Sequence, residues 1–446
     1  MSRIRVWRAG YYSRLDVSVI EFRSCSSNLQ HQSTPSLAPD ADSVLTASRG
    51  YKGLLGQIGV RGDVNKIDFQ QAVPAGAPEA TVPVWDWGVR LFHWSLLICV
   101  AFCAYTGFLG PRNWLDVHLI SGIGIAALVA FRLVWGWTGT TYSLFRTFSI
   151  SPTAIGRHLS DIAQGRGERH LGHNPLGAAM VFLLLGVLIL LILTGVVALG
   201  GALKQGPLAF VATFSAGASA REIHELLAIA LLAMIAAHLA GVAFESWRMR
   251  ENLAKAMLTG RKAAASTIPP PSGRARPLAA AATLGSIATL VIPGTIILSR
   301  LPARGVPREA LDPAYARECG SCHFAYPPSL ATAQSWTAVM SGLSDHFGEN
   351  ASLDPGASAR IRDWLIANAS ERWDTQAAHL VRRASQSEPE RITAAPAWVD
   401  VHSAIPDAVF RSAAVGARGA CRACHQDAAT GRFDPQRIAI PIGVRP

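Results

Sequence analysis

The chain has 446 residues, of which 50% are hydrophobic and only 16% are charged, and its formal net charge is +11. Soluble domains usually carry about 25% charged residues, so this balance indicates a membrane protein and excludes a chain that is disordered throughout. The excess of basic residues does not indicate a nucleic-acid partner, because these residues lie on loops between apolar stretches, as in membrane proteins. Seven cysteines, four of them in two Cys-x-x-Cys-His strings, exclude a disulfide-stapled scaffold.

Residues 1–80 show no sustained hydrophobic periodicity and are rich in Ser, Arg, Gly, Ala and Pro. They contain no basic stub followed by an apolar core and a cleavage site, so the sequence predicts no signal peptide there. We expect a disordered cytoplasmic N-terminal extension. A start codon placed too far upstream is the alternative.

Five apolar stretches follow, each about 20 residues long, which is the length needed to cross a bilayer. They lie at roughly 91–109, 119–137, 177–199, 222–244 and 279–298. A Pro-rich cytoplasmic linker at 261–278 precedes the fifth stretch, and the chain is polar from residue 299 onward. The predicted fold is an all-α membrane protein with a four-helix bundle at 81–260, a fifth transmembrane helix, and a mainly helical or irregular domain at 299–446.

The loops between these stretches differ in their number of basic residues. Loops 138–175 and 245–278 contain eleven Lys and Arg, whereas loops 110–118 and 200–221 contain three. Cytoplasmic loops carry the excess, which predicts a cytoplasmic N-terminus in a multi-pass protein of the bacterial cytoplasmic (inner) membrane. Only the fifth span then delivers residues 299–446 to the periplasm.

Four histidines lie in or beside the first, second and fourth stretches, where ionisable side chains are rare. They are His93, His118, His224 and His238. The last two are fourteen residues apart, so they lie only about 40° apart around one helix and ~21 Å apart along it. Depth then pairs His93 with His238 on the cytoplasmic side and His118 with His224 on the periplasmic side. Two bis-imidazole sites predict two non-covalently bound b haems.

Other roles are open to the polar residues in the bundle. The histidines could pack in the bundle by hydrogen bonding to neighbours. A proton relay is a further alternative, but the spans contain no comparable set of buried carboxylates. Arg90 and Arg132 could pair haem propionates, although snorkelling to the membrane interface is favoured. His173 could belong to a quinone pocket on the cytoplasmic face, but helix entry, with Asn174 as cap and Pro175 in the first turn, is favoured.

Two covalent haem strings lie in the polar C-terminal region. They are Cys319-Gly320-Ser321-Cys322-His323 and Cys421-Arg422-Ala423-Cys424-His425. In such a string two thiols bond the haem vinyl groups and the histidine binds the iron, which predicts two c haems. This attachment takes place outside the cytoplasmic membrane, in agreement with the loop charges. The alternative, zinc, needs four ligands per ion and suits a cytoplasmic domain better.

The second axial ligands of the two c haems are predicted from their spacing. His346 lies 23 residues after His323, and His402 lies 23 residues before His425. This mirror spacing favours ligation by two imidazoles, which generally gives a lower potential than His/Met ligation. His379 and Met340 are the spare candidates.

Several of these segments resemble known families. Residues from about 80 to 260 resemble the bacterial cytochrome b561 / nickel-iron hydrogenase b-type cytochrome family. The segments that carry this resemblance are 84–94 (VWDWGVRLFHW), 118–122 (HLISG), 172–176 (GHNPL) and 222–225 (EIHE) with His238. Residues from about 312 to 446 resemble the dihaem cytochrome c family through both haem strings, 345–348 (DHFG) and 438–441 (IAIP). Neither family covers 1–80, and a fifth span departs from the four-helix pattern.

The resemblance implies that the four bundle histidines bind haem b and that the protein shuttles electrons between the quinone pool and a redox partner. The expected function is respiratory electron transfer through two b and two c haems, with quinone or quinol as the exchangeable substrate. The expected partners are the lipid bilayer and a soluble periplasmic redox protein, and the bundle could pair as a homodimer. A quinol:cytochrome oxidoreductase activity is left open. The alternatives are a haem-dependent oxidase or reductase of superoxide, oxygen or ferric ion, and a membrane anchor for a hydrogenase-type enzyme.

Overall fold

The computed structural model describes residues 81–111, 114–166, 170–263 and 273–441. The expected disordered extension at 1–80 lies outside these residues, as do residues 264–272 of the Pro-rich linker. Within the described residues, five helices are long and apolar enough to cross a membrane, which confirms the five predicted spans. They are α2 (Trp87–Phe108), α3 (Leu115–Thr138), α5 (Pro175–Gly201), α6 (Phe214–Met249) and α8 (Pro277–Ser299).

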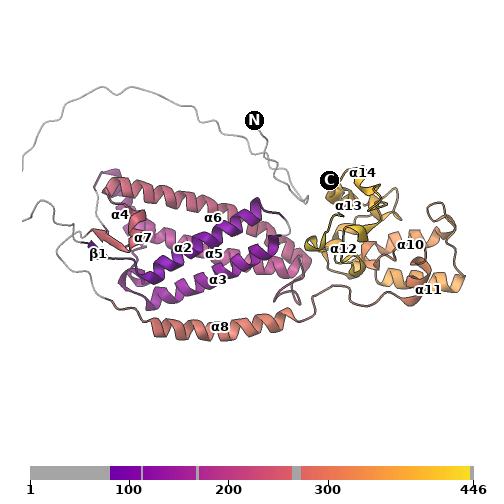
Figure 1. The fold of residues 1–446 in the computed structure, drawn as a ribbon, viewed down its shortest axis with the longest axis horizontal. Helices are drawn as coiled ribbons and strands as arrows, with labels where there is room; N and C mark the ends of the chain where they lie inside the picture. Colours follow the sequence, from indigo (N-terminus) through magenta and orange to yellow (C-terminus); the bar gives the residue numbers. More distant parts are fainter. Residues whose placement is uncertain (1–80, 112–113, 167–169, 264–272, 442–446) are drawn as a thin grey trace, which may run out of the picture. The chain divides into compact units, whose positions relative to one another are not determined.

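Four of these helices form the bundle shown in Figure 1. α2 packs along α3 and α5 packs along α6, while α3 also contacts α5 and α8. Side chains from the four helices meet in one apolar cluster whose buried members are Phe92, Ile125, Val129, Leu185, Leu188 and Leu231. The other faces of the helices remain apolar and exposed, as expected for surfaces that contact lipid rather than water.

Side-chain caps explain where three of the helices begin. The carboxylate of Asp86 accepts a hydrogen bond from the Val89 amide at the start of α2. Asn174 accepts from the Gly177 amide and Pro175 occupies the first turn of α5, so the predicted helix-entry role of this segment is confirmed. Thr213 caps α6, which begins eight residues before the apolar stretch predicted at 222.

Short elements close the bundle at one end. α4 (Pro152–Ala163) follows α3, and α7 (Leu253–Thr259) follows α6. β1 (Thr81–Pro83) pairs antiparallel with β2 (Arg261–Ala263), with Thr81 opposite Ala263. This pairing joins the beginning and the end of the bundle domain, where α2 starts and the linker to α8 leaves.

The C-terminal domain consists of short helices and turns around two apolar cores. Its α-helices are α9 (Pro313–Cys319), α10 (Ala333–Ser341), α11 (Pro355–Ala367), α12 (Gln376–Val381), α13 (Pro396–His402) and α14 (Asp407–Phe410). The larger core contains the buried Tyr315, Trp336, Ile361 and Leu365 beside Cys319. The smaller core contains Val409 and Phe410 beside Cys424. Each core therefore lies next to one of the two haem strings.

Candidate haem sites

The structure brings His118 and His224 together near the start of α3 and within α6. The centroids of their imidazole rings are 6.1 Å apart. Imidazole nitrogens bind first-row metal ions at about 2 Å, and the ring centroid lies about 1 Å beyond the nitrogen. Two imidazoles on opposite sides of one iron would therefore have centroids about 6 Å apart. The His118–His224 pair fits a bis-imidazole haem in this respect.

Two Thr-Gly dipeptides, one on α2 and one on α5, support this pair. The Thr106 hydroxyl donates to the Phe102 carbonyl and lies 3.0 Å from Nδ1 of His118. The Thr194 hydroxyl donates to the Leu190 carbonyl and lies 3.1 Å from Nδ1 of His224. Since each hydroxyl proton is already used, Nδ1 is the donor in each imidazole, and in His224 it also lies 3.0 Å from the Leu191 carbonyl. Nε2 is then left for a metal.

The glycine of each dipeptide makes room for the same histidine. A Cβ on Gly107 would lie 3.7 Å from Cε1 of His118, and a Cβ on Gly195 would lie 3.3 Å from Cε1 of His224. These four supporting residues were not singled out in the sequence. The sequence signal that could have indicated them is a Thr-Gly dipeptide near the same end of both the first and the third span.

The second predicted pair in the bundle consists of His93 and His238. The two imidazoles are close enough to interact electrostatically. Nδ1 of His93 is buried without a hydrogen-bond partner among the described residues. An unpaired buried imidazole nitrogen is costly unless another group binds it. The ligand roles of both bundle pairs stay predictions.

Arg132, which like His238 acts electrostatically on His173, corrects one expectation. Snorkelling to the membrane interface was favoured for it, but its side chain is only 3% exposed. Its guanidinium instead lies over the ring of Phe145, 4.4 Å from the centroid. The snorkelling interpretation is wrong for Arg132 because the aromatic side chains after α3 fold back over it.

His173 lies between two aromatic rings at the same end of the bundle. Its ring centroid is 4.7 Å from that of Trp85 and 4.6 Å from that of Phe148. Burial, with the nearby charges of Arg132 and Lys262, lowers the pKa of His173 to about 3. The imidazole is therefore neutral at physiological pH and can offer one N–H donor and one acceptor.

The first c-type site joins the string at the end of α9 to a turn after α10. The rings of His323 and His346 are stacked with their centroids 6.1 Å apart, which again fits two imidazoles across an iron. Nδ1 of His323 donates to the Phe324 carbonyl at 2.8 Å, so Nε2 is the nitrogen available for a metal. Burial raises the pKa of the neighbouring Cys319 to about 11, with help from Glu318.

The second c-type site has the same arrangement. The rings of His402 and His425 have centroids 6.2 Å apart. Nδ1 of His402 donates to the Trp398 carbonyl at 2.8 Å, and the Trp398 ring stacks on the imidazole at 4.2 Å. Burial lowers the pKa values of His402 and His425, which favours the neutral form that a metal ligand needs.

The two c-type sites are linked, and the spare ligand candidates lie elsewhere. The Tyr326 hydroxyl, three residues after His323, donates to the carbonyl of Gly419, two residues before the second string. Met340 is buried in the larger core. His379 contacts Asp374 at 2.9 Å and stacks on Phe214. Neither spare candidate is paired with a haem-string histidine.

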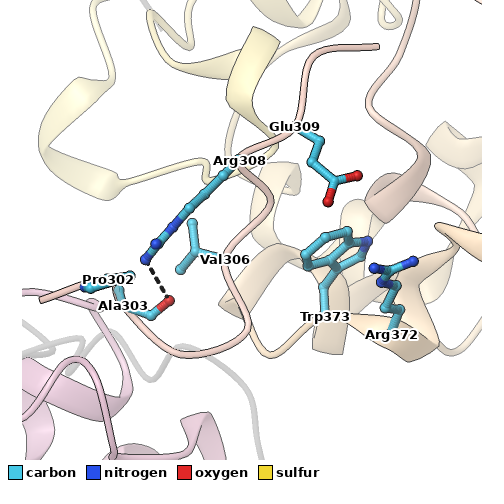
Figure 2. Close-up of a pocket in the computed structure, with 7 residues that line it drawn as sticks. All are labelled: Pro302, Ala303, Val306, Arg308, Glu309, Arg372 and Trp373. Atoms are coloured by element: carbon cyan, nitrogen blue, oxygen red, sulfur yellow. Dashed lines mark hydrogen bonds between the residues drawn. The ribbon is translucent and has the colours of Figure 1, made fainter. Parts of the chain in front are cut away.

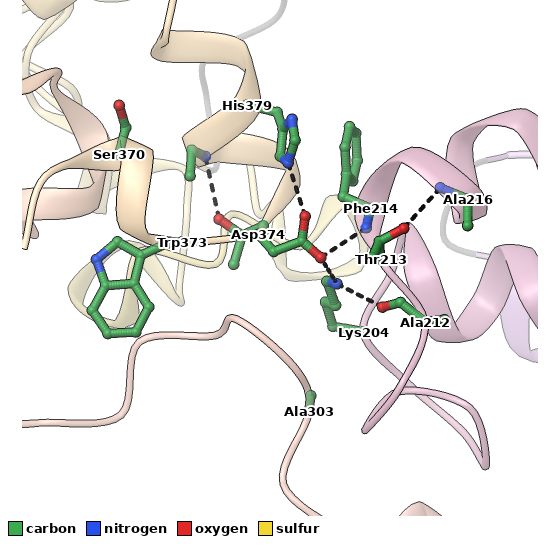
Figure 3. A network of polar contacts seen from close by, with 12 residues as sticks. Lys204, Ala212, Thr213, Phe214, Ala216, Ala303, Ser370, Trp373, Asp374 and His379 are labelled. Atoms are coloured by element: carbon green, nitrogen blue, oxygen red, sulfur yellow. Dashed lines mark hydrogen bonds and ion pairs between the residues drawn. The ribbon is translucent and has the colours of Figure 1, made fainter.

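Asp374 joins the C-terminal domain to the loop between α5 and α6 (Figure 3). One carboxylate oxygen accepts from the Lys204 ammonium at 2.7 Å and from the Phe214 amide at 2.8 Å, and the other contacts Nε2 of His379. Burial alone would raise the pKa of Asp374, but the hydrogen bonds from Lys204, His379 and Phe214 hold it below its ordinary value. The side chain of Lys204 is only 3% exposed and that of Asp374 is 22% exposed, so the ion pair is partly buried.

A shallow pocket lies on the segment that follows α8 (Figure 2). Its lining includes Arg308, Glu309, Arg372 and Trp373. Arg308 donates to the Ala303 carbonyl at its edge. The pocket contains none of the paired histidines or string cysteines, so it is separate from the candidate haem sites.

Comparison with known proteins identifies two segments. The family description of prokaryotic cytochrome b561 matches residues 84–260, and that of dihaem cytochrome c matches residues 315–433. No curated protein matches the chain.

Two solved structures of dihaem cytochromes are similar to the C-terminal part. A diheme cytochrome c from Rhodobacter sphaeroides is 36% identical and aligns over 28% of this chain and 97% of its own, with a TM-score of 0.25. A diheme cytochrome type c from Shewanella baltica OS155 is 35% identical over 29% of this chain and 93% of its own, with a TM-score of 0.24. With its haem-string histidines paired as described, the chain belongs to the dihaem cytochrome c family through residues 315–433, and its bundle matches the description of prokaryotic cytochrome b561 over residues 84–260.

Proposed function

We propose that this membrane haem electron-transfer protein passes electrons between the quinone pool and a soluble periplasmic redox protein. The observation that carries the proposal is the repeated spacing of the histidines. Three predicted pairs have ring centroids 6.1–6.2 Å apart, and the fourth pair lies within electrostatic reach. Two pairs belong to the apolar bundle and two to the polar domain. Quinone is a lipid-soluble substrate, so the bundle is the part suited to meet it.

The residues of each site would hold a haem with both axial positions filled. His93 with His238 and His118 with His224 would each hold one b haem without covalent bonds. Cys319, Cys322, Cys421 and Cys424 would bond the two c haems, with His323, His346, His402 and His425 as axial ligands. The bound haems would supply one-electron oxidation and reduction. Because two imidazoles leave no open position, this arrangement favours electron transfer over substrate chemistry at iron.

The same proposal assigns sides of the membrane. Basic residues are concentrated on the loops between α3 and α5 and after α6, which favours a cytoplasmic position for those loops in an inner membrane. α8 would then deliver the dihaem domain to the periplasm. The ion pair between Lys204 and Asp374 supports this, because it joins that domain to the end of the bundle that holds His118 and His224.

Rapid mixing with a quinol analogue tests the proposal. When the oxidised protein is mixed with the quinol, we expect the b absorbance to change first and the c absorbance to follow within the same turnover. If quinol reduced neither type of haem, electrons would enter from the C-terminal domain or from a partner, and the proposed direct exchange with quinone would be wrong.

Asp374→Asn should slow the transfer from b to c without changing the haem content. The substitution leaves the buried Lys204 ammonium without its carboxylate, and a buried polar group that loses a partner in this way costs about 2 kcal/mol. The measurement is the rate of c reduction after quinol mixing. Asp363→Asn, which alters the exposed pair with Arg362, is the matched control and should behave like wild type.

The wild-type rate should also depend on pH through this carboxylate. Because the folded pKa of Asp374 is lowered from its ordinary value of 3.8, its contribution is fully present above about pH 4 and is lost as pH falls below that. Asp374→Asn should lack this acid-side decline. An identical acid-side decline in both proteins would contradict the assignment.

A further inference from the structure

Arg132 is a buried cation whose charge is incompletely paired. Its guanidinium lies over Phe145, 4.4 Å from the ring centroid, and is also 6.0 Å from that of Phe148. Within the described part of the chain, Nη1 is buried and has no hydrogen-bond partner. A desolvated charge of this kind is strongly unfavourable unless an anion pairs with it.

The acidic group that acts on Arg132 is already engaged by other donors. The Asp86 carboxylate attracts Arg132 through space. However, it accepts hydrogen bonds from the Val89 amide at 2.9 Å, the Trp135 indole at 3.1 Å and the Thr140 hydroxyl at 2.6 Å. Asp86 therefore caps α2 and ties it to the end of α3, and it does not bond Nη1 of Arg132.

A second unpaired polar atom lies beside Arg132. Nδ1 of His173 is buried without a hydrogen-bond partner among the described residues. His173 interacts electrostatically with Arg132, Lys262 and His238. Lys262 is itself buried and donates to the His170 carbonyl at 3.2 Å. Two positive charges and a neutral imidazole thus converge next to one of the predicted haem ligands.

We propose that Arg132 and His173 bind a propionate carboxylate of the b haem held between His93 and His238, with Lys262 as a second positive charge nearby. This inference rests on the proposed function. A guanidinium and an imidazole N–H are both donors suited to a carboxylate. The ligand is anionic, because a neutral quinone carbonyl would leave the buried charge of Arg132 uncompensated.

The test is the midpoint potential of each b haem in the purified holoprotein. Arg132→Gln removes a positive charge that favours the reduced iron, so the reduction equilibrium of one b haem should fall about tenfold, which is about 59 mV for a one-electron couple. The other b haem and both c haems should keep their potentials. Arg132→Lys should lower the midpoint potential of that b haem by less than Arg132→Gln does. Arg146→Gln, at an exposed arginine beside Phe145, is the control and should change nothing.

Infrared spectroscopy supplies a second readout on the same proteins. With ¹³C-labelled haem propionates, the redox difference spectrum should show carboxylate bands that shift in Arg132→Gln and Arg132→Lys but not in Arg146→Gln. Unchanged bands and potentials in Arg132→Gln would overturn the proposal and leave Arg132 with packing on Phe145 only.

Haem content separates this proposal from the proposed function. Loss of one b haem in Arg132→Gln but not in Arg132→Lys would support the proposal, because lysine keeps the positive charge and glutamine does not. Loss in both variants would overturn it, since a positive charge would then not suffice. A wild-type protein with fewer than two b haems would instead contradict the proposed function itself.

Discussion

His224→Ala should reduce the acid-extractable haems from two to one and leave both covalent haems on the polypeptide. The wild-type ring pair His118–His224 is spaced for two bonds to one iron. Without His224 a single imidazole remains, and a haem held without covalent bonds should be lost. The measurement is the haem content of the purified protein before and after acid extraction.

His238→Ala should remove the other extractable haem, because it belongs to the His93–His238 pair. The two variants should therefore lose spectrally different b haems. His158→Ala is the matched control, since His158 is also a buried histidine of the same domain but lies outside the pairs. If His224→Ala lost a covalent haem, or if either variant lost both b haems, the assignment of two separate sites would be wrong.

Hydropathy and helical geometry were sufficient to predict the bundle. The apolar stretches predicted all five spans, because burial in lipid demands about 20 consecutive apolar residues. The pairing of His118 with His224 followed from their depth along the helices. The start of α6 at Phe214 was missed, because the polar residues 221–222 lower the hydropathy there although the helix continues through them.

Other features depend on contacts between distant parts of the chain. Lys204 and Asp374 are 170 residues apart, and no local pattern indicates that they pair. Burial of Arg132 depends on how the segment around Phe145 folds over α3. The threonines that orient His118 and His224 come from neighbouring helices. Spacing along one helix can therefore indicate which histidines lie at the same depth, but not the residues from other helices that contact them.

His402→Ala should create a carbon monoxide-binding site at one c haem of the reduced protein. In the wild type, His402 faces His425 across 6.2 Å and is oriented by its hydrogen bond to the Trp398 carbonyl. With both axial positions filled, we expect no binding at any haem. Removing His402 leaves the covalently held haem in place with an open axial position. The measurement is the carbon monoxide difference spectrum, with one c haem responding per chain.

The same logic applies to the first c-type site and provides the control. His346→Ala should also open one c haem, because His346 faces His323 at 6.1 Å. His379→Ala should bind no carbon monoxide, since His379 contacts Asp374 and Phe214 rather than a haem string. Carbon monoxide binding by the wild type would mean that one haem has a free or labile axial position. That result would favour the oxidase or reductase alternative over electron transfer alone.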